Sequence, residues 1–462
     1  MSISYRDSSQ SAGLQNQLIQ LAAFQNPEFY KAQAMRRSTY NLSRILFCSE
    51  EFPKHIGLPR GCFPDAENLF NSLGVEIKII DERFKGKPLR VGFKGKLRTQ
   101  QKHAVKELRK HDIGILSAAT AFGKTVVAAK LIAVRKRNTL VLVHRKQLMD
   151  QWRERLSVFL GIEPKEIGQL SGSKKHITGK LDVAVIQSLC RKGVVDDIVA
   201  EYGHVIVDEC HHVAALSFEQ LMKKVKANYV LGLTATPVRK DGHHPIIIMQ
   251  CGPIRYRYSS KEATADSTFN HFVNIKQTGF HVPFENEQPA LYEIYQKLIA
   301  DKTRNDLICE DILESLKSNR SPLLLTERTE HLQIIADLLE GKVKNIVILK
   351  GGMSKKQRDS AYEQLKNIDK DDERIILATG RYIGEGFDDA RLDTLFLALP
   401  ISWKGTIQQY AGRLHRQYDG KKEVRIYDYL DESIPMLARM YKRRLSGYKS
   451  IGYEITEPGN TT

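Results

Sequence analysis

The chain has 462 residues, of which 42% are hydrophobic and 27% charged, which excludes an intrinsically disordered protein and suits about two to four domains. Its 71 lysines and arginines against 54 acidic residues give a formal net charge of +17, so we expect a polyanionic partner, nucleic acid. No apolar run approaches the roughly 18 residues of a membrane-spanning helix, and the six scattered cysteines form no Cys-x-x-Cys pair, so we expect a cytoplasmic protein without membrane contact, zinc or disulfides.

Residues 1–84 are predicted to form a helical segment followed by a small α+β domain. Leu14–Phe24 is amphipathic, and Phe29–Arg37 has the pattern of a second helix. The pattern changes at Ile45, where the small domain begins. Its expected elements are a strand at Ile45–Cys48, a turn at Gly57–Gly61, a helix at Pro64–Leu73 and an alternating strand at Val75–Ile80.

Residues 85–260 alternate short apolar runs with segments of helical length. This alternation predicts an α/β lobe with a doubly wound parallel sheet, whose strands are buried on both faces. The expected strands are Ile113–Leu116, Leu140–Val143, Val183–Ile186, His204–Val207 and Tyr229–Leu233.

A polar stretch at Ser259–Thr268 breaks this pattern, and we expect a linker over residues 261–290. A second α/β series over residues 291–462 predicts a lobe of the same architecture, followed after Pro435 by a basic helix. In that helix Arg439–Arg444 mixes basic and aromatic residues, which suits either a nucleic-acid groove or a solvated face. The expected strands are Pro322–Thr326, Asn345–Leu349, Arg374–Thr379, Thr394–Leu399 and Val424–Tyr429.

A run that ends in Gly-Lys-Thr joins the strand expected at Ile113–Leu116 to a helical stretch. Strand, tight loop and helix in this order form the phosphate-binding loop of nucleotide hydrolases, because backbone N–H groups and the helix dipole favour phosphate. Ala118 stands where the usual pattern has its first glycine, and an ordinary strand–helix turn is the alternative. The expected contacts are the backbone of Ala121, Phe122 and Gly123 to a nucleotide, Lys124 to its β- and γ-phosphates, and the Thr125 hydroxyl to Mg²⁺.

Two carboxylates follow the apolar run His204–Val207. The carboxyl end of a buried strand is where Mg²⁺ beside a bound triphosphate is held. Asp208 would take the metal, mostly through water, and Glu209 would orient and deprotonate the attacking water. An acidic strand end that caps the next helix is the alternative, and the phosphate loop upstream favours the catalytic interpretation.

Asp208-Glu209-Cys210-His211 resembles the box of the superfamily 2 helicases, and other segments resemble further motifs of that family in the family's order, with similarity to the XPB-like branch. The resemblance implies two RecA-like lobes that use ATP and Mg²⁺. The segments that carry it are Leu97–Gln101, Val143–Leu148, Ile186–Leu189, Thr234–Pro237, Ala378–Gly380 with Gly384–Asp388, and Gln409–Arg416.

The resemblance also implies roles for single residues. By it, Gln101 would recognise adenine, Arg145 and Gln187 would contact the nucleic-acid backbone, and His211 would couple ATP to strand binding. The coupling motif contributes Thr234 and Thr236, the fifth motif Thr379, Gly386 and Asp388, and the Gln-x-x-Gly-Arg-x-x-Arg motif Gln409, Arg413 and Arg416.

The spacing of the two arginines also predicts a function without the resemblance. Arg413 and Arg416 lie three apart, so both would face one side of a helix, although a basic surface helix is the alternative. A guanidinium delivered from outside the phosphate loop stabilises the charge that builds on the γ-phosphate. If it comes from the second lobe, hydrolysis requires lobe closure, and closure would move two backbone-binding surfaces along a strand.

A few residues have competing interpretations. Trp403 would stack on a base or pack in a core or between lobes. The adjacent histidines at 211–212 and 243–244 are poor chelators, so we favour roles without metal.

Phe24–Tyr30 and Leu58–Gly61 resemble the region before the helicase core in helicases of TOTE-type bacterial conflict systems, and the α+β unit is similar to the damage-recognition domain of XPB-like helicases. These resemblances imply a bacterial or phage-related defence or repair protein with a primase or nuclease partner. We expect an ATP-driven DNA helicase or translocase, with the 3′-to-5′ polarity that the XPB-like resemblance implies. An RNA helicase and an ATP-switched nucleic-acid clamp are the alternatives.

Overall fold

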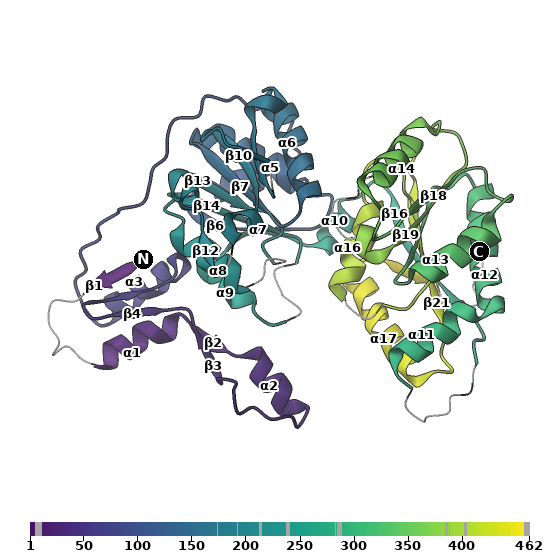
Figure 1. The fold of residues 1–462 in the computed structure, drawn as a ribbon, viewed down its shortest axis with the longest axis horizontal. Helices are drawn as coiled ribbons and strands as arrows, with labels where there is room; N and C mark the ends of the chain where they lie inside the picture. The colour runs from purple at the N-terminus through teal and green to yellow at the C-terminus, as the bar shows by residue number, and fades with distance from the viewer. Residues whose placement is uncertain are drawn as a thin grey trace. The chain divides into compact units, whose positions relative to one another are not determined.

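The computed structural model describes residues 1–4, 12–172, 174–191, 193–211, 215–236, 241–281, 283, 289–383, 387, 389–401 and 404–456. The chain forms two compact units, a first unit of residues 1–118 and 122–257 and a second unit of residues 119–121 and 258–462. Figure 1 shows the ribbon coloured along the chain. None of the helices in the described part of the chain is long and apolar enough to cross a membrane.

The described residues of the first unit form an eight-stranded sheet in the order β15-β6-β14-β13-β7-β10-β8-β9. From β6 to β8 neighbouring strands are parallel, and β9 is antiparallel to β8. The expected strands of this lobe are confirmed, with β8, β9 and β15 in addition. The bounds are β6 Ile113–Ala118, β7 Thr139–Val143, β8 Gly168–Ser171, β9 Lys174–His176, β10 Leu181–Val185, β13 His204–Val207, β14 Tyr229–Thr234 and β15 Ile254–Tyr258.

Helices connect these strands and bury one face each. In α6, Leu148, Trp152 and Leu156 recur every four residues and are buried, and Gly161 ends the helix with a positive φ of 63°. Two short strands, β11 Cys190–Arg191 and β12 Val194–Val195, pair with each other. The helices are α4 Thr99–Leu108, α5 Lys124–Arg135, α6 Lys146–Leu160, α7 Ile186–Leu189, α8 Ala215–Lys224 and α9 His244–Cys251.

The N-terminal residues add a small antiparallel sheet, a two-stranded ribbon and short helices to the first unit. Leu18 and Phe70 belong to their core, which Met249 of α9 joins. Arg60 Nη2 donates to Met222 O at 3.0 Å, which ties this part to α8. The bounds are β1 Ser2–Ser4, α1 Ala12–Leu21, β2 Ala23–Gln25, α2 Pro27–Ala34, β3 Ile45–Phe47, β4 Glu50–Phe52, β5 His55–Gly57 and α3 Phe63–Ser72.

Two expectations for this region are wrong. The helix expected over Leu14–Phe24 ends at Leu21, because Ala23–Gln25 pairs with β3. Val75–Ile80 forms no strand. Val75 and Ile77 pack against the N-terminal core, while Ile79 and Ile80 are exposed. The alternation of apolar residues therefore comes from the contacts of two side chains, and no partner strand lies beside this segment in the described part of the chain.

The second unit, where it is described, contains a seven-stranded parallel sheet in the order β18-β19-β17-β20-β21-β16-β22. The expected strands are present, and the sheet also takes up β16 and β22. The bounds are β16 Asn270–Gln277, β17 Pro322–Thr326, β18 Ile346–Leu349, β19 Ile375–Thr379, β20 Thr394–Leu397, β21 Glu423–Leu430 and β22 Glu454–Thr456.

The linker expected over residues 261–290 needs correction, because this segment contains part of α10 and all of β16. β16 lies between β21 and β22 and alternates buried with more exposed positions, and its polar residues on the exposed side look like a loop in the sequence. The basic C-terminal helix is present as α17. Its Arg444 is buried against Asp428 and therefore faces no solvent groove. The helices are α10 Ser260–Ala265, α11 Leu291–Ala300, α12 Lys302–Lys317, α13 Thr329–Leu339, α14 Lys355–Asn367, α15 Gly380–Ile383, α16 Lys404–Leu414 and α17 Pro435–Ser450.

Candidate nucleotide and nucleic-acid site

The phosphate-loop candidate lies between β6 and α5, at the carboxyl end of a strand inside the first sheet. Gly123 caps α5 with a φ of 86°, and Ala121 also has a positive φ, of 68°. The φ at position 123 favours glycine, and a Cβ there would lie 2.5 Å from Gln101 Nε2, so a larger residue would also displace the end of that side chain. Ala118 is the last residue of β6 and has no positive φ, which explains why alanine is accommodated there.

Lys124 is the first residue of α5, and its ammonium group faces the loop and the strand end of β13. Its Nζ lies 3.2 Å from Ala118 O and 3.5 Å from Glu209 Oε1. The side chain is only 12% exposed, and the neighbouring Thr125 is buried. The ammonium is thus held by oxygen atoms, the kind of partner that phosphate would also provide.

The two carboxylates follow β13 and differ in environment. Asp208 Oδ2 accepts a hydrogen bond from Trp152 Nε1 at 2.7 Å, and Asp208 Oδ1 accepts one from Glu209 N at 3.1 Å. Burial, together with the adjacent charge of Glu209, raises the pKa of Asp208 above its ordinary value. Glu209 has a positive φ of 44°, which is uncommon for a residue with a Cβ. Hard carboxylate and hydroxyl oxygens from Asp208 and Thr125 are donors that Mg²⁺ accepts, so the residues fit the expected cation.

The coupling candidates meet where β13 and β14 end side by side. Val207 of β13 is in register with Gly232 of β14, so the residues that follow both strands share one edge of the sheet. His211 Nδ1 lies 2.8 Å from Thr234 Oγ1 and 3.3 Å from Glu209 Oε2. Thr236 N donates to the same Thr234 hydroxyl at 3.1 Å. A continuous set of contacts therefore runs from the candidate base to the coupling motif.

Gln101 is buried and is hydrogen-bonded to the phosphate loop. Its Oε1 accepts from Arg98 N at 2.9 Å, and its Nε2 donates to Phe122 O at 2.7 Å. Arg98 Nη2 also donates to Phe122 O. The Tyr256 ring of β15 lies 6.4 Å from the Phe122 ring, and its hydroxyl donates to Gln100. The segment expected to recognise adenine is thus fixed to the phosphate loop.

The nucleic-acid candidates of the first unit also lie at strand ends. Arg145 precedes α6 just after β7, and Gln187 is an exposed residue of α7 just after β10. β7 and β10 are parallel neighbours, with Val143 opposite Val185. Both side chains therefore start from the same edge of the sheet as Asp208.

The candidates of the second unit lie at the end of β19 and along α16. Thr379 ends β19, and its Oγ1 accepts from Gly351 N at 3.3 Å. Gln409 and Arg413 are on α16, and Arg413 Nη1 donates to Phe387 O at 2.9 Å. Arg416 lies two residues beyond the last residue of α16, so the expectation that both arginines share a helix face is wrong. Gly386, Asp388 and Trp403 lie outside the described residues.

The segment that carries Arg416 is held by Lys421, which the sequence does not single out. Lys421 Nζ donates to Arg416 O at 2.8 Å and to Leu414 O at 3.0 Å. Ala390 O and Leu392 O also lie within hydrogen-bond distance of Nζ, at 2.8 Å and 2.7 Å, so the three N–H groups share four acceptors. One ammonium group therefore fastens the end of α16 to the chain that precedes β20.

Trp152 is the other residue of the site that sequence reasoning missed. It is a buried core residue of α6, and only its indole N–H reaches the Asp208 carboxylate. Its distance from Asp208 along the sequence offers no signal, and the spacing of apolar residues in α6 indicates packing alone.

Comparisons with known proteins place both units in families of nucleic-acid enzymes. Residues 94–239 match the family described as "Type III restriction enzyme, res subunit", and residues 304–417 match "Helicase conserved C-terminal domain". A protein of Acanthamoeba polyphaga mimivirus, named as an ATP-dependent RNA helicase, is 25% identical over 422 residues, which is 87% of this chain and 75% of that protein.

Two further likenesses are narrower. The DNA 3′-5′ translocase XPB2 of Sulfurisphaera tokodaii is 32% identical over 205 residues, which is 44% of each chain. The structure of S. cerevisiae Dbp5 bound to RNA and ADP BeF3 shares the fold, with a TM-score of 0.57 at 13% identity over 78% of this chain and 88% of that one. With their two RecA-like lobes, the matched regions identify the chain as an ATP-dependent superfamily 2 helicase, with a ResIII domain followed by a Helicase_C domain.

Proposed function

We propose that this chain couples the hydrolysis of ATP, with Mg²⁺, to 3′-to-5′ movement along DNA and to its unwinding. The observation that carries the proposal is the set of contacts from Lys124 through Glu209 and His211 to Thr234. It joins Lys124 of the phosphate loop, the candidate base and the coupling motif, all of which belong to the first unit. The high net positive charge supports a polyanionic track.

In this proposal the first unit binds and activates the triphosphate. Backbone N–H groups of residues 121–125 and the Lys124 ammonium hold its phosphates, while Gln101 recognises adenine. Thr125 and Asp208 hold Mg²⁺, which neutralises charge on the phosphate oxygens when it is bound. Glu209 takes the proton of the attacking water. His211 contacts both Glu209 and Thr234, so a change in the charge of the Glu209 carboxylate alters the contact of His211 with the coupling motif.

The second unit supplies the remaining cations in this proposal. Arg413 and Arg416 stabilise the charge that develops on the γ-phosphate, with Gln409, Gly386 and Asp388 on the same nucleotide. Arg145, Gln187 and Thr379 contact the backbone of the strand, Trp403 stacks on a base, and Thr236 belongs to the coupling loop. Hydrolysis then depends on both units, and each turnover changes how the strand is held.

DNA is favoured by the identity with the archaeal translocase, which is the higher of the two identities although it covers less of the chain. RNA is the second candidate substrate, because the relative matched over most of the chain is named as an RNA helicase. A role in defence or repair with a primase or nuclease partner rests on the N-terminal resemblance. An ATP-switched clamp would keep nucleic-acid binding without strand separation.

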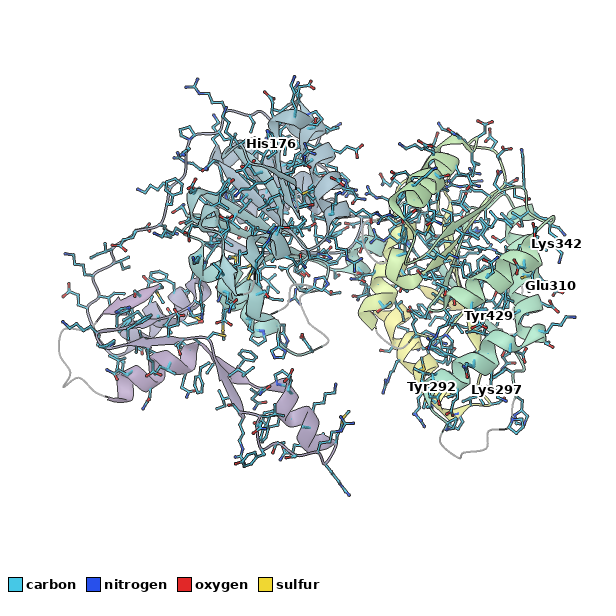
Figure 2. The ribbon with its side chains drawn as sticks, viewed as in Figure 1. His176, Tyr292, Lys297, Glu310, Lys342 and Tyr429 are labelled. Carbon is cyan, nitrogen blue, oxygen red and sulfur yellow. The ribbon has the colours of Figure 1, made fainter. Side chains whose placement is uncertain are left out.

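The chemistry is tested with single substitutions. We expect Lys124→Ala and Glu209→Gln to lower ATP turnover at least about 100-fold, with ATP binding retained in Glu209→Gln, because a general base contributes about 10²–10⁴ in rate. Arg416→Ala should lose about 10³-fold or more and keep strand binding. The exposed Lys342→Ala and Glu310→Gln serve as controls of the same residue types (Figure 2). Near-normal turnover in Lys124→Ala or Glu209→Gln would refute the assignment.

The substrate is tested by strand displacement with DNA and RNA duplexes of identical sequence. Each duplex is prepared with a 3′ tail, with a 5′ tail and with blunt ends. We expect ATP-dependent separation of the 3′-tailed DNA duplex. Displacement of RNA alone would assign the RNA helicase, and nucleic-acid-stimulated turnover with no displacement of any duplex would leave the clamp or a duplex translocase.

A further inference from the structure

The N-terminal arm, defined here as residues 23–47, has a composition unlike a mixed protein surface. No Asp or Glu occurs between Glu28 and Glu50, and this stretch carries Lys31, Arg36, Arg37 and Arg44. Ordinary solvated surfaces intersperse both signs of charge. The arm therefore carries Lys31 and three arginines against a single acidic residue, Glu28.

The arm is built as a ribbon with a helix at its end. β2 and β3 pair in antiparallel register from Ala23 opposite Phe47 to Gln25 opposite Ile45, and α2 follows β2 directly. Asn26 begins α2 by accepting a hydrogen bond from Glu28 N at 3.0 Å, and its side-chain amide donates to Ser43 O at 2.7 Å. In Figure 1 α2 lies at the far end of this ribbon from α1 and α3.

Large aromatic rings on the arm are exposed. The Tyr40 side chain is 93% exposed, the highest value for a large hydrophobic residue among those that the structure describes. Phe47 is 51% exposed and Tyr30 is 39% exposed. Each of the three rings therefore has surface on which a base can stack.

The cations of the arm are not neutralised by contacts. Within the described residues, none of Lys31, Arg36, Arg37 and Arg44 forms an ion pair with a carboxylate. The Arg44 guanidinium lies 5.6 Å from the centre of the Phe29 ring, so it packs on an aromatic face within the arm. The arm thus carries both cations without carboxylate partners and exposed aromatic rings, the two kinds of group that bind phosphates and bases.

The base of the arm lies beside the segment that follows the coupling motif. The Phe24 ring packs edge-on against His243, with ring centres 6.1 Å apart. A Cβ at Gly242 would lie 2.7 Å from Pro27 Cγ, so the two segments are in close contact. A ligand held by the arm would therefore be anchored to the same unit that carries Thr234 and Thr236.

We propose that residues 23–47 are a second nucleic-acid site, which takes an unpaired strand outside the two lobes. Tyr40, Tyr30 and Phe47 stack on bases, while Lys31 and the neighbouring arginines contact phosphates. An unpaired strand is the occupant because the ring faces can reach bases only where those bases are not stacked in a duplex. This inference rests on the proposed function as a nucleic-acid motor and adds a contact that the motor motifs do not supply.

The test compares charge reversals on the arm and on the second unit. Lys31→Glu with Arg37→Glu leaves Arg36, which has a positive φ, and Arg44, which packs on Phe29, unchanged. Lys297→Glu with Lys342→Glu is the matched control on exposed residues of the second unit (Figure 2). The full chain is titrated against a fluorescein-labelled 20-nucleotide oligo-dT by anisotropy at two salt concentrations.

We expect the arm variant to bind at least about tenfold more weakly than the control, with the slope of log affinity against log salt reduced by about 1.4, since two phosphate contacts are lost. Tyr40→Ala should weaken binding about fivefold or more, while Tyr292→Ala on the second unit should not. Tyr40 packs on little, so its removal leaves the fold intact and checks the result independently.

Equal affinities for the arm variant and its control would overturn the proposal, whether both are weakened or neither is. An equal loss on a blunt DNA duplex would overturn the assignment of an unpaired strand. ATP turnover without nucleic acid should be unchanged in every arm variant. Failure of the proposed motor function is recognised separately, because the unsubstituted chain would then show no turnover stimulated by DNA or RNA.

Discussion

The two units hold partly or fully buried arginine side chains in different ways. In the first unit, Arg60 donates to Met222 O and Val225 O, at the carboxyl end of α8. Arg135 donates to Leu108 O and His111 O, at the carboxyl end of α4. Burial lowers the pKa of each to about 10. Both guanidinium groups thus cap helix ends and have backbone carbonyl oxygens as acceptors.

In the second unit, the two arginines with the least exposed side chains pair with carboxylates that follow or belong to β21. Arg304 Nε lies 3.0 Å from Asp431 Oδ1, and both side chains are fully buried. Arg444 Nε lies 2.8 Å from Asp428 Oδ2. Burial acts to lower the pKa of Arg444, but the charge of Asp428 outweighs it and raises that pKa above its ordinary value.

The two units therefore provide different partners for a guanidinium group that is removed from water: backbone carbonyl oxygens in the first unit and carboxylates in the second. A helix carboxyl end carries partial negative charge, so an arginine in the first unit joins distant segments without a further carboxylate. The second unit instead buries full charges of both signs, and its stability depends on keeping each pair complete. We expect the same class of substitution to have a larger effect in the second unit.

The largest expected effect is that of Arg304→Met. It leaves Asp431 buried without its partner, which should cost about 3–5 kcal/mol of unfolding free energy. Hydrogen exchange of amides in β20 and β21 measures the loss within the second unit. The double substitution Arg304→Met with Asp431→Leu is the control and should recover much of the loss. A cost below about 1 kcal/mol for the single change would contradict the interpretation of the pair.

Arg135→Met is the matched substitution in the first unit and should cost less. It removes donors from two carbonyl oxygens and from His204 Nε2, which lies 2.8 Å from the guanidinium, but strands no opposite charge. We expect about 1–3 kcal/mol, measured by amide exchange in β6 and β13. If Arg135→Met lowered the unfolding free energy as much as Arg304→Met, an arginine that caps a helix end would not differ in stability cost from an arginine in a buried ion pair, and the comparison would be wrong.

The smallest expected effect is a change in acid sensitivity of the second unit. Burial, with the nearby charge of Arg304, lowers the pKa of His331 to about 3. Between pH 6.5 and 3 the unfolded chain binds a proton at this site and the folded chain does not, so stability falls as the pH falls. His331→Gln should flatten this dependence by up to about 1.4 kcal/mol per pH unit.

The exposed His176, in the first unit, provides the control His176→Gln (Figure 2). Urea unfolding of the full chain at pH 6 and pH 5 compares the variants, with amide exchange in β17 reporting on the second unit. An unchanged pH dependence in His331→Gln would exclude His331 as a source of the acid sensitivity.

Much of the fold followed from local pattern. Continuous apolar runs such as Leu140–Val143 predicted buried parallel strands correctly, because a strand covered on both faces has no polar side. β16 was missed because it alternates in exposure near a sheet edge. Val75–Ile80 alternates apolar and polar residues as a strand does, but it forms no strand because none of the described strands pairs with it. In both places the outcome depends on whether a pairing strand lies alongside: β16 has β21 and β22 beside it, and Val75–Ile80 has no partner strand among the described residues.

For the site, the sequence by itself determined which residues stand at strand ends. Lys124, Asp208 and Thr234 each follow an apolar run, and parallel strands end at one edge, so their proximity could be inferred. Only the tertiary structure decided that Trp152 holds Asp208 and that Lys421 fastens the segment of Arg416. The reason is that hydrogen bonds depend on atom positions after packing, and spacing along the chain fixes those positions only within one element.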